Sequence, residues 1–113
     1  MSPKLKRDSI TRRMFTELRS KMQNSPTDWD VAKLAKSVYL TRSHFSVQYA
    51  ALFGVSPGED LKKFIMEKAE KMLLDTDMTV TEIADRLGYS NAENFIRAFR
   101  KYSGETPHKF RNR

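Results

Sequence analysis

The sequence predicts an all-α protein of seven helices, in which two helix-turn-helix units are joined by a long linker helix. The chain has only four glycines and four prolines in 113 residues, and it has few runs of β-branched residues, which favours helices over strands. A short helix, a turn and a longer helix also occur twice in the same order. The length is that of one domain, or of two very small ones that share a core.

The first predicted helix runs from about Ser9 to Gln23, and the Asn-Ser-Pro run at 24–26 ends it. Together with the basic residues before it, this helix makes up the N-terminal segment, 1–26. Every fourth residue along it is apolar, which is the spacing of one stripe on a helix. The stripe consists of Ile10, Met14, Leu18 and Met22.

The first helix-turn-helix unit is predicted over residues 27–57. Thr27 or Asp28 is the expected cap of its short helix, whose apolar residues follow the i, i+3, i+4, i+7 pattern. Thr41 is the expected N-cap of the longer helix, and Gly54 closes that helix because glycine readily adopts a positive φ. The apolar residues of the short helix are Val31, Leu34, Ala35 and Val38.

The linker helix is predicted to begin at Ser56-Pro57, with serine as N-cap and proline at the first helical position. It continues to about Leu74, and about 17 residues at 1.5 Å each give a length of roughly 25 Å. With the connector that follows it, the linker segment covers residues 58–78.

The second helix-turn-helix unit and a C-terminal helix are predicted over residues 79–113. Thr79 or Thr81 is the expected cap of the short helix, and Ser90 or Asn91 is the expected cap of the longer one. The apolar residues of these two helices are Val80, Ile83, Ala84, Leu87, Phe95, Ala98, Phe99 and Tyr102.

An internal repeat relates the two units. Positions of the short helix recur 49 residues later and those of the longer helix recur 50 residues later, so the second copy has one extra residue in its turn. Aromatic residues anchor the longer helix to the core, which leaves its opposite face free to enter a major groove. Because the repeat is in tandem within one chain, we expect an asymmetric DNA site. The matched pairs include Leu34/Ile83, Ala35/Ala84, Phe45/Phe95, Tyr49/Phe99, Gly54/Gly104 and Pro57/Pro107.

Several motifs in this framework are specific. The second copy contains VTEIADRLGYS at 80–90, FRK at 99–101 and GETP at 104–107, and the first contains FGVSP at 53–57. With these motifs the chain resembles, over about residues 27–112, the DNA-binding domain of AraC/XylS-type transcription regulators. The resemblance implies a bacterial regulator that places two recognition helices in successive major grooves, about 34 Å apart, on one face of the duplex.

The chain departs from the family pattern in its first half. Ala50 and Ala51 stand where the family often has lysine, and Ile65 stands in the linker helix where it often has arginine. Tyr39 occupies a turn position that is often glycine. We therefore expect the first recognition helix to attract phosphates weakly.

The outward faces of the two longer helices, matched to the family, predict the residues that contact bases. Arg42 would pair with guanine through two hydrogen bonds, Val47 would touch a thymine methyl group, and Arg97 is the strongest candidate. Glu93 would accept from a cytosine amino group, or alternatively pair with Arg97 at i+4 within the helix. The predicted base-contacting residues are Arg42, Ser43, Ser46, Val47, Ala92, Glu93, Asn94 and Arg97.

Phosphate contacts are expected near helix N-termini, where free N–H groups and the helix dipole favour anions, and along the basic C-terminal end. The predicted phosphate-contacting residues are Thr41, Ser90, Asn91, Lys101, His108, Lys109 and Arg111. By contrast, His44 is interpreted as a packed or phosphate-facing residue rather than a metal ligand, and Trp29 as a core anchor rather than a base-stacking group. The residues expected to fill the core are Met14, Met22, Met66 and Met72.

The net charge of +7 is unevenly distributed. Residues 1–23 carry +5, residues 24–96 carry −3 and residues 97–113 carry +5. The charged ends are either solvated tails or part of a DNA-binding surface. In the second case, the second unit and the two ends supply most of the electrostatic attraction.

Composition also bears on the classes of function. Without cysteine there is no disulfide, iron–sulfur cluster or thiolate zinc site, and the two histidines are far apart in sequence, so we expect no metal and no cofactor. The chain lacks a Gly-rich phosphate loop and a paired-carboxylate constellation, so we do not expect an enzyme. No run of 18 apolar residues predicts a membrane span, and we expect a cytoplasmic location.

An alternative function is a helical protein-interaction module that docks a transcription partner such as RNA polymerase. The two functions are compatible, because members of the family that the chain resembles are often activators. Those members usually carry a separate sensing or dimerisation domain, which does not fit in the 26 leading residues. We therefore expect that domain to be absent from this chain, and favour an excised C-terminal domain over a short regulator.

Overall fold

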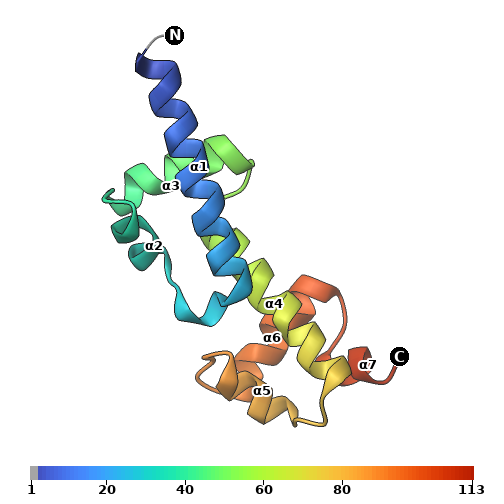
Figure 1. The fold of residues 1–113 in the computed structure, drawn as a ribbon. Helices are drawn as coiled ribbons and strands as arrows, with labels where there is room; N and C mark the ends of the chain where they lie inside the picture. Colours follow the sequence, from blue (N-terminus) through green and yellow to red (C-terminus); the bar gives the residue numbers. More distant parts are fainter. Residues whose placement is uncertain (1–2) are drawn as a thin grey trace. The chain divides into compact units, whose positions relative to one another are not determined.

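The computed structural model describes residues 3–113, with side chains from residue 9 onward. In this part of the chain there are seven α-helices, one 3-10 helix and no strand, which confirms the all-α prediction (Figure 1). The chain divides into two compact units, the first ending at Lys62 and the second comprising Lys63–Arg113. The basic side chains expected before residue 9 lie outside the described residues.

The first unit is built from a long helix, a 3-10 turn and a pair of helices. These are α1 (Pro3–Asn24), η1 (Pro26–Asp28), α2 (Val31–Ser37), α3 (Arg42–Phe53) and the first residues of α4 (Pro57–Asp75). The start of α1 precedes the expected one by six residues, and η1 was not predicted.

The buried face of α1 differs from the predicted apolar stripe. Ile10 and Met14 are 53% and 40% exposed, so the expectation that Met14 fills the core was wrong. Phe15 is buried instead, with its ring centroid 5.2 Å from that of Phe45. A strict four-residue spacing drifts around a helix by about 40° per step, so a stripe of four such residues cannot all face one partner. From residue 9 onward, the buried residues of α1 are Phe15, Leu18 and Met22.

Side-chain caps fix the starts of the short and long helices. The short helix of the first unit is capped by Asp30, which accepts a 2.8 Å hydrogen bond from the Lys33 N–H, and not by Thr27 or Asp28, which lie in η1. The predicted caps of the other helices are confirmed, with Ser90 and Thr81 excluded as alternatives. They are Thr41 for α3, Thr79 for α5 and Asn91 for α6.

The second unit contains the rest of α4 with α5 (Val80–Arg86), α6 (Ala92–Ser103) and α7 (Pro107–Arg111). The second half of α4 covers the core of this unit as α1 covers that of the first, and Met72 and Met22, 50 residues apart, are both buried. The repeat therefore includes the helix that precedes each pair. The core consists of Met66, Ala69, Met72, Leu73, Ile83, Ala84, Leu87, Phe95, Phe99 and Phe110.

The two cores differ at one matched position. Asp60 is 2% exposed in the first unit, and its carboxylate accepts from Arg19 Nε at 2.6 Å and from the Tyr49 hydroxyl at 2.5 Å. Fifty residues later stands Phe110, which packs edge-on against Phe99. The first unit thus holds a polar cluster where the second holds apolar side chains, and no motif of the sequence indicates this cluster.

Two further observations concern the whole described chain. None of its helices has the length and apolar character needed to cross a membrane. Among the residues described, no three histidine, aspartate or glutamate side chains gather where a metal ion could be held.

Candidate nucleic-acid interface

The outward face of α6 is produced by its helical period. Phe95 and Phe99 are fully buried, and Arg97 lies two residues from each, which is about 200° around the helix axis. The helix begins at the Asn91 cap and ends at Gly104, whose φ of 86° lies in the region that glycine adopts readily. The aromatic pair therefore fixes the direction in which the basic residues point.

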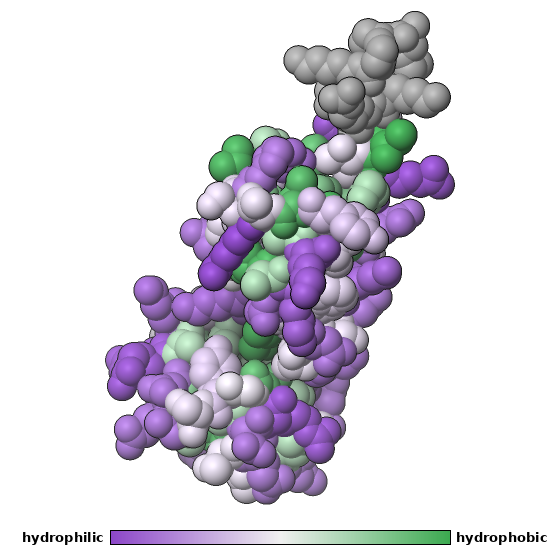
Figure 2. All heavy atoms as spheres, turned by 90° about the vertical axis from the view of Figure 1, so that its left-hand side faces the viewer, coloured by the Kyte–Doolittle hydropathy of each residue, from purple (hydrophilic) through white to green (hydrophobic). Residues whose placement is uncertain are grey.

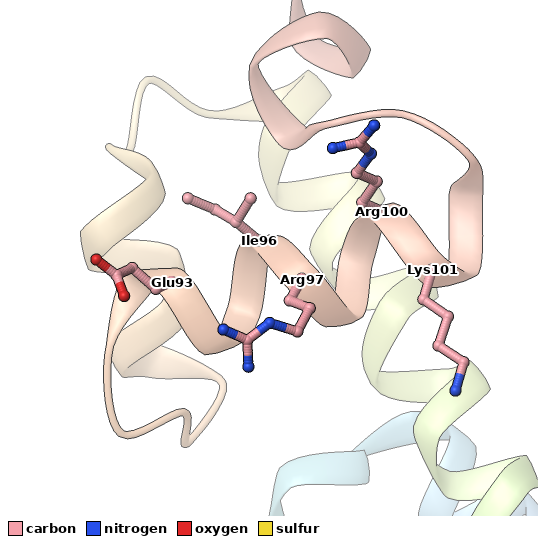
Figure 3. Close-up of a pocket in the computed structure, with 5 residues that line it drawn as sticks. All are labelled: Glu93, Ile96, Arg97, Arg100 and Lys101. Carbon is pink, nitrogen blue, oxygen red and sulfur yellow. The ribbon is translucent and has the colours of Figure 1, made fainter.

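Five residues on α6 line an open hollow on this face: Glu93, Ile96, Arg97, Arg100 and Lys101. Figure 3 shows them projecting from the single helix, with three cationic side chains and one carboxylate. Three of these residues are predicted contacts, the position of Ile96 on this face also follows from the sequence, and Arg100 was not predicted. The spacing would have identified Arg100, which follows Arg97 by one helical turn.

The two predicted roles of Glu93 differ in geometry. Among the ion pairs of the described residues, none joins Glu93 to Arg97, and in Figure 3 the Glu93 carboxylate lies apart from the Arg97 guanidinium. The i, i+4 pair is thus not formed in the structure. Both groups are exposed to solvent on the outward face.

The outward face of α3 has a different composition. Phe45 and Tyr49 are fully buried, and the opposite side exposes Val47, 69% exposed, with smaller residues around it. His44 is exposed and is hydrogen-bonded to Gln48, with 2.7 Å between their Nε2 atoms, so it is not a packed residue. The other exposed residues on α3 are Arg42, Ser43, Ala50 and Ala51, and Ser46 is half-buried.

The predicted phosphate contacts fall into two groups. Lys101, His108 and Lys109 are exposed, whereas the side chains of Thr41 and Asn91 are used as helix caps. In the same way, Ser90 Oγ accepts a 2.8 Å hydrogen bond from the amide of Asn94, a predicted base contact. These hydrogen bonds hold the helix N-termini, whose remaining N–H groups are the feature that favours anions.

Arg111 has a structural use that sequence analysis did not foresee. Its Nε donates to the Leu73 carbonyl at 2.9 Å, and its Nη2 donates to the Thr76 carbonyl at 3.2 Å. These carbonyls lie at and just beyond the C-terminal end of α4, where carbonyl groups lack helical partners. Arg111 therefore ties α7 to the end of α4, and its contact with phosphate stays a prediction.

The turns before the two longer helices have the same hydrogen bonds and different residues. Tyr39 adopts a φ of 60° in the first turn, and Gly88 adopts 87° at the corresponding place in the second. The Tyr39 N–H donates to Lys36 O, and the Gly88 N–H donates to Asp85 O, both at 3.1 Å. A bulky residue in this region is strained, and the Tyr39 side chain is 93% exposed.

Comparison with known proteins agrees with this geometry. A family model described as a helix-turn-helix domain matches residues 34–113. The chain belongs to the AraC-type helix-turn-helix family. This AraC-type chain is 33% identical to the uncharacterised HTH-type transcriptional regulator YtdP of Bacillus subtilis strain 168 over 79 residues. The matched segment covers 70% of this chain and 10% of YtdP.

Several solved structures are similar to this AraC-type chain. The C-terminal domain of AraT, a response regulator from Geobacillus stearothermophilus, has a TM-score of 0.79 at 29% identity and covers 88% of this chain and 84% of that one. The DNA-binding domain of AdpA, a global transcriptional factor in complex with a target DNA, has a TM-score of 0.78 at 25% identity and covers 87% and 89%. The chain spans between 10% and 34% of the lengths of the first three curated relatives.

Proposed function

We propose that this chain binds double-stranded DNA in a sequence-specific manner and thereby regulates bacterial transcription. The observation that carries the proposal is the outward face of α6, on which Arg97, Arg100 and Lys101 are exposed above a buried aromatic pair. Guanidinium groups match the paired acceptors of guanine in the major groove, and lysine and arginine attract phosphates. Membership of the AraC-type family and the likeness to a domain solved with its target DNA support the same function.

The tandem arrangement extends this proposal. Each unit offers one longer helix, α3 or α6, whose buried aromatic face leaves the other face for a major groove. Two successive grooves are about 34 Å apart, and a chain with two different recognition helices reads an asymmetric site. A regulator of this kind acts in the cytoplasm, where the bacterial chromosome lies, and an activator would also contact RNA polymerase.

Arg97→Ala tests the central base contact. We expect a loss of about 1–3 kcal/mol of binding free energy, together with relaxed discrimination at one base pair, because a bidentate contact to guanine is removed. The measurement is a titration of the preferred duplex and of its single-base variants. The matched control is Arg13→Ala, which removes an exposed arginine of α1 that pairs with Glu17 and should leave the base preference unchanged. Unchanged affinity and unchanged base preference in Arg97→Ala would contradict the assignment.

Selection from random duplexes tests the function itself. We expect an enriched asymmetric sequence with two half-sites whose centres are about one helical turn apart, since the two recognition helices differ. Recovery of no enriched sequence would overturn sequence-specific binding, and would favour a helical module that docks a protein partner.

A further inference from the structure

The repeat gives each outward position of α3 a counterpart on α6, and at three of these positions the two helices have opposite chemistry. Three positions of α3 with the i, i+3, i+4 spacing of one helix face are Val47, Ala50 and Ala51, all exposed. Fifty residues later, the exposed counterparts on α6 are Arg97, Arg100 and Lys101. One scaffold therefore presents small apolar groups in the first unit and long cations in the second.

The contrast extends beyond these three positions. Residues 42–61 hold one arginine and two acidic residues, a net charge of −1, whereas the matched residues 92–111 hold five Lys/Arg and two glutamates, a net charge of +3. Phosphate attraction depends on the number of cations near the backbone. The first recognition helix is therefore poorly equipped for the electrostatic role that the second can fill.

An exposed apolar face has a specific counterpart in a major groove. The C5-methyl group of thymine is the apolar group that the bases present there, and valine and alanine side chains fit against it. Val47 is 69% exposed at the middle of α3, on the side opposite the buried Phe45 and Tyr49. On the face drawn in Figure 2, green hydrophobic side chains reach the surface of the first unit, in the upper part of the picture, among purple hydrophilic ones.

We propose that the first unit reads a thymine-containing half-site through methyl contacts with Val47 and Ala50, while the second unit supplies the charge. This inference rests on the proposed function, which places α3 in a major groove. It gives the asymmetric site a composition: thymine methyl groups dominate the half-site of the first unit, where Arg42 is the one arginine or lysine on α3, and guanine and phosphates dominate the other half-site. Added salt should then weaken the contacts of the second unit, whereas the methyl contacts of the first unit are insensitive to salt.

The test replaces thymine by deoxyuridine, which removes only the C5-methyl group. After selection of a duplex, the half-site whose base preference relaxes in Arg97→Ala is assigned to the second unit, and uridine is placed in the other half. We expect the dissociation constant of the wild-type chain to rise about fourfold for each contacted methyl group. Val47→Ala should bind the thymine duplex about three- to tenfold more weakly than the wild type does. Its affinity should not change when deoxyuridine replaces the thymine that Val47 contacts.

Two control variants distinguish the methyl contact from DNA binding itself. Arg97→Ala should keep the full sensitivity to uridine in the first half-site, and Val47→Arg should lose it while the salt dependence steepens by about one unit. If uridine leaves wild-type affinity unchanged, or weakens wild type and Val47→Ala equally, the methyl contact is wrong while DNA binding stands. If no duplex is enriched, both proposals fail.

Discussion

Asp60 shows how one residue can change the chemistry of a duplicated core. Its carboxylate is buried, which is costly unless hydrogen bonds replace those of water. Arg19 and Tyr49 supply them, and the hydrogen bond to Asp60 raises the pKa of Arg19. Burial, together with the hydrogen bond to Asp60, raises the pKa of Tyr49 well above its ordinary value. Because Asp60 lies in the first turn of α4, the cluster joins α1, α3 and α4 within the first unit.

Tyr49→Phe tests this cluster. Loss of the hydroxyl leaves the buried carboxylate with one donor fewer, so we expect the free energy of unfolding to fall by about 1–3 kcal/mol at neutral pH. The pH dependence should also change. A raised pKa in the folded state means that the stabilisation is present below about pH 10, the value for an unfolded tyrosine, and is lost as the pH rises beyond it.

Urea unfolding at pH 8 and pH 10.5 measures both effects. The wild type should lose more stability than Tyr49→Phe between the two pH values. Part of the loss should remain in the variant, because burial also raises the pKa values of Tyr89 and Tyr102. Equal losses of stability in the two proteins would show that the pKa of Tyr49 is not raised in the folded state.

At the scale of elements, the two turns before the recognition helices share a positive φ, which Tyr39 adopts in the first turn and Gly88 adopts in the second. Tyr39→Gly removes the strain of a positive φ, worth about 1–2 kcal/mol, and adds the entropy cost of glycine, about 0.5–1 kcal/mol. We expect a net gain in stability of up to about 1.5 kcal/mol. Gly88→Ala is the matched control, since nothing lies within 4 Å of an added Cβ, and it should lose about 1 kcal/mol. Thermal unfolding checks both, and a destabilised Tyr39→Gly would show that the exposed ring contributes contacts of its own.

The starts of α3, α5 and α6 were predictable because capping is local chemistry, whereas the predicted starts of α1 and α2 were wrong. Thr41 and Thr79 each accept from a backbone N–H three residues later, a relation that the sequence itself contains. The buried face of α1 was not predictable in the same way. Whether Met14 or Phe15 turns inward depends on the ring of Phe45, which is 30 residues distant from Phe15.

In the candidate site, too, local patterns were predictable and contacts between distant residues were not. The internal repeat and the helical period are properties of the sequence, and together they indicate the outward positions of α3 and α6, including Val47 and Arg97. The roles of Arg111 and Asp60 were missed because their partners Arg19, Leu73 and Thr76 are 35–41 residues away, and neither spacing nor composition marks such pairs.

For the whole molecule, the distribution of charge matters more than the total of +7. The second unit carries five of its ten lysines and arginines on α6 and α7, where Lys101 and Lys109 are exposed. The matched residue of Lys109 in the first unit is Glu59, also exposed and in the first turn of α4. The repeat therefore contains a natural pair of positions at which charge differs while the backbone is similar.

Lys109→Ala and Glu59→Lys use this pair to measure how the units share phosphate binding. Removal of one phosphate contact should weaken binding to all duplexes alike and make the plot of log affinity against log salt shallower by about 0.9. Glu59→Lys should strengthen binding to all duplexes and steepen the plot by a similar amount, provided that the first unit also approaches the DNA backbone.

Helical content by circular dichroism is the control for both variants, because a lysine in the first turn of a helix lowers its stability by some tenths of a kcal/mol. If Lys109→Ala weakens binding to only one sequence, Lys109 contacts a base rather than a phosphate. If Glu59→Lys has no effect on any duplex while Lys109→Ala does, the start of α4 lies away from the DNA backbone. Of these two matched positions, only that of the second unit then contacts phosphate.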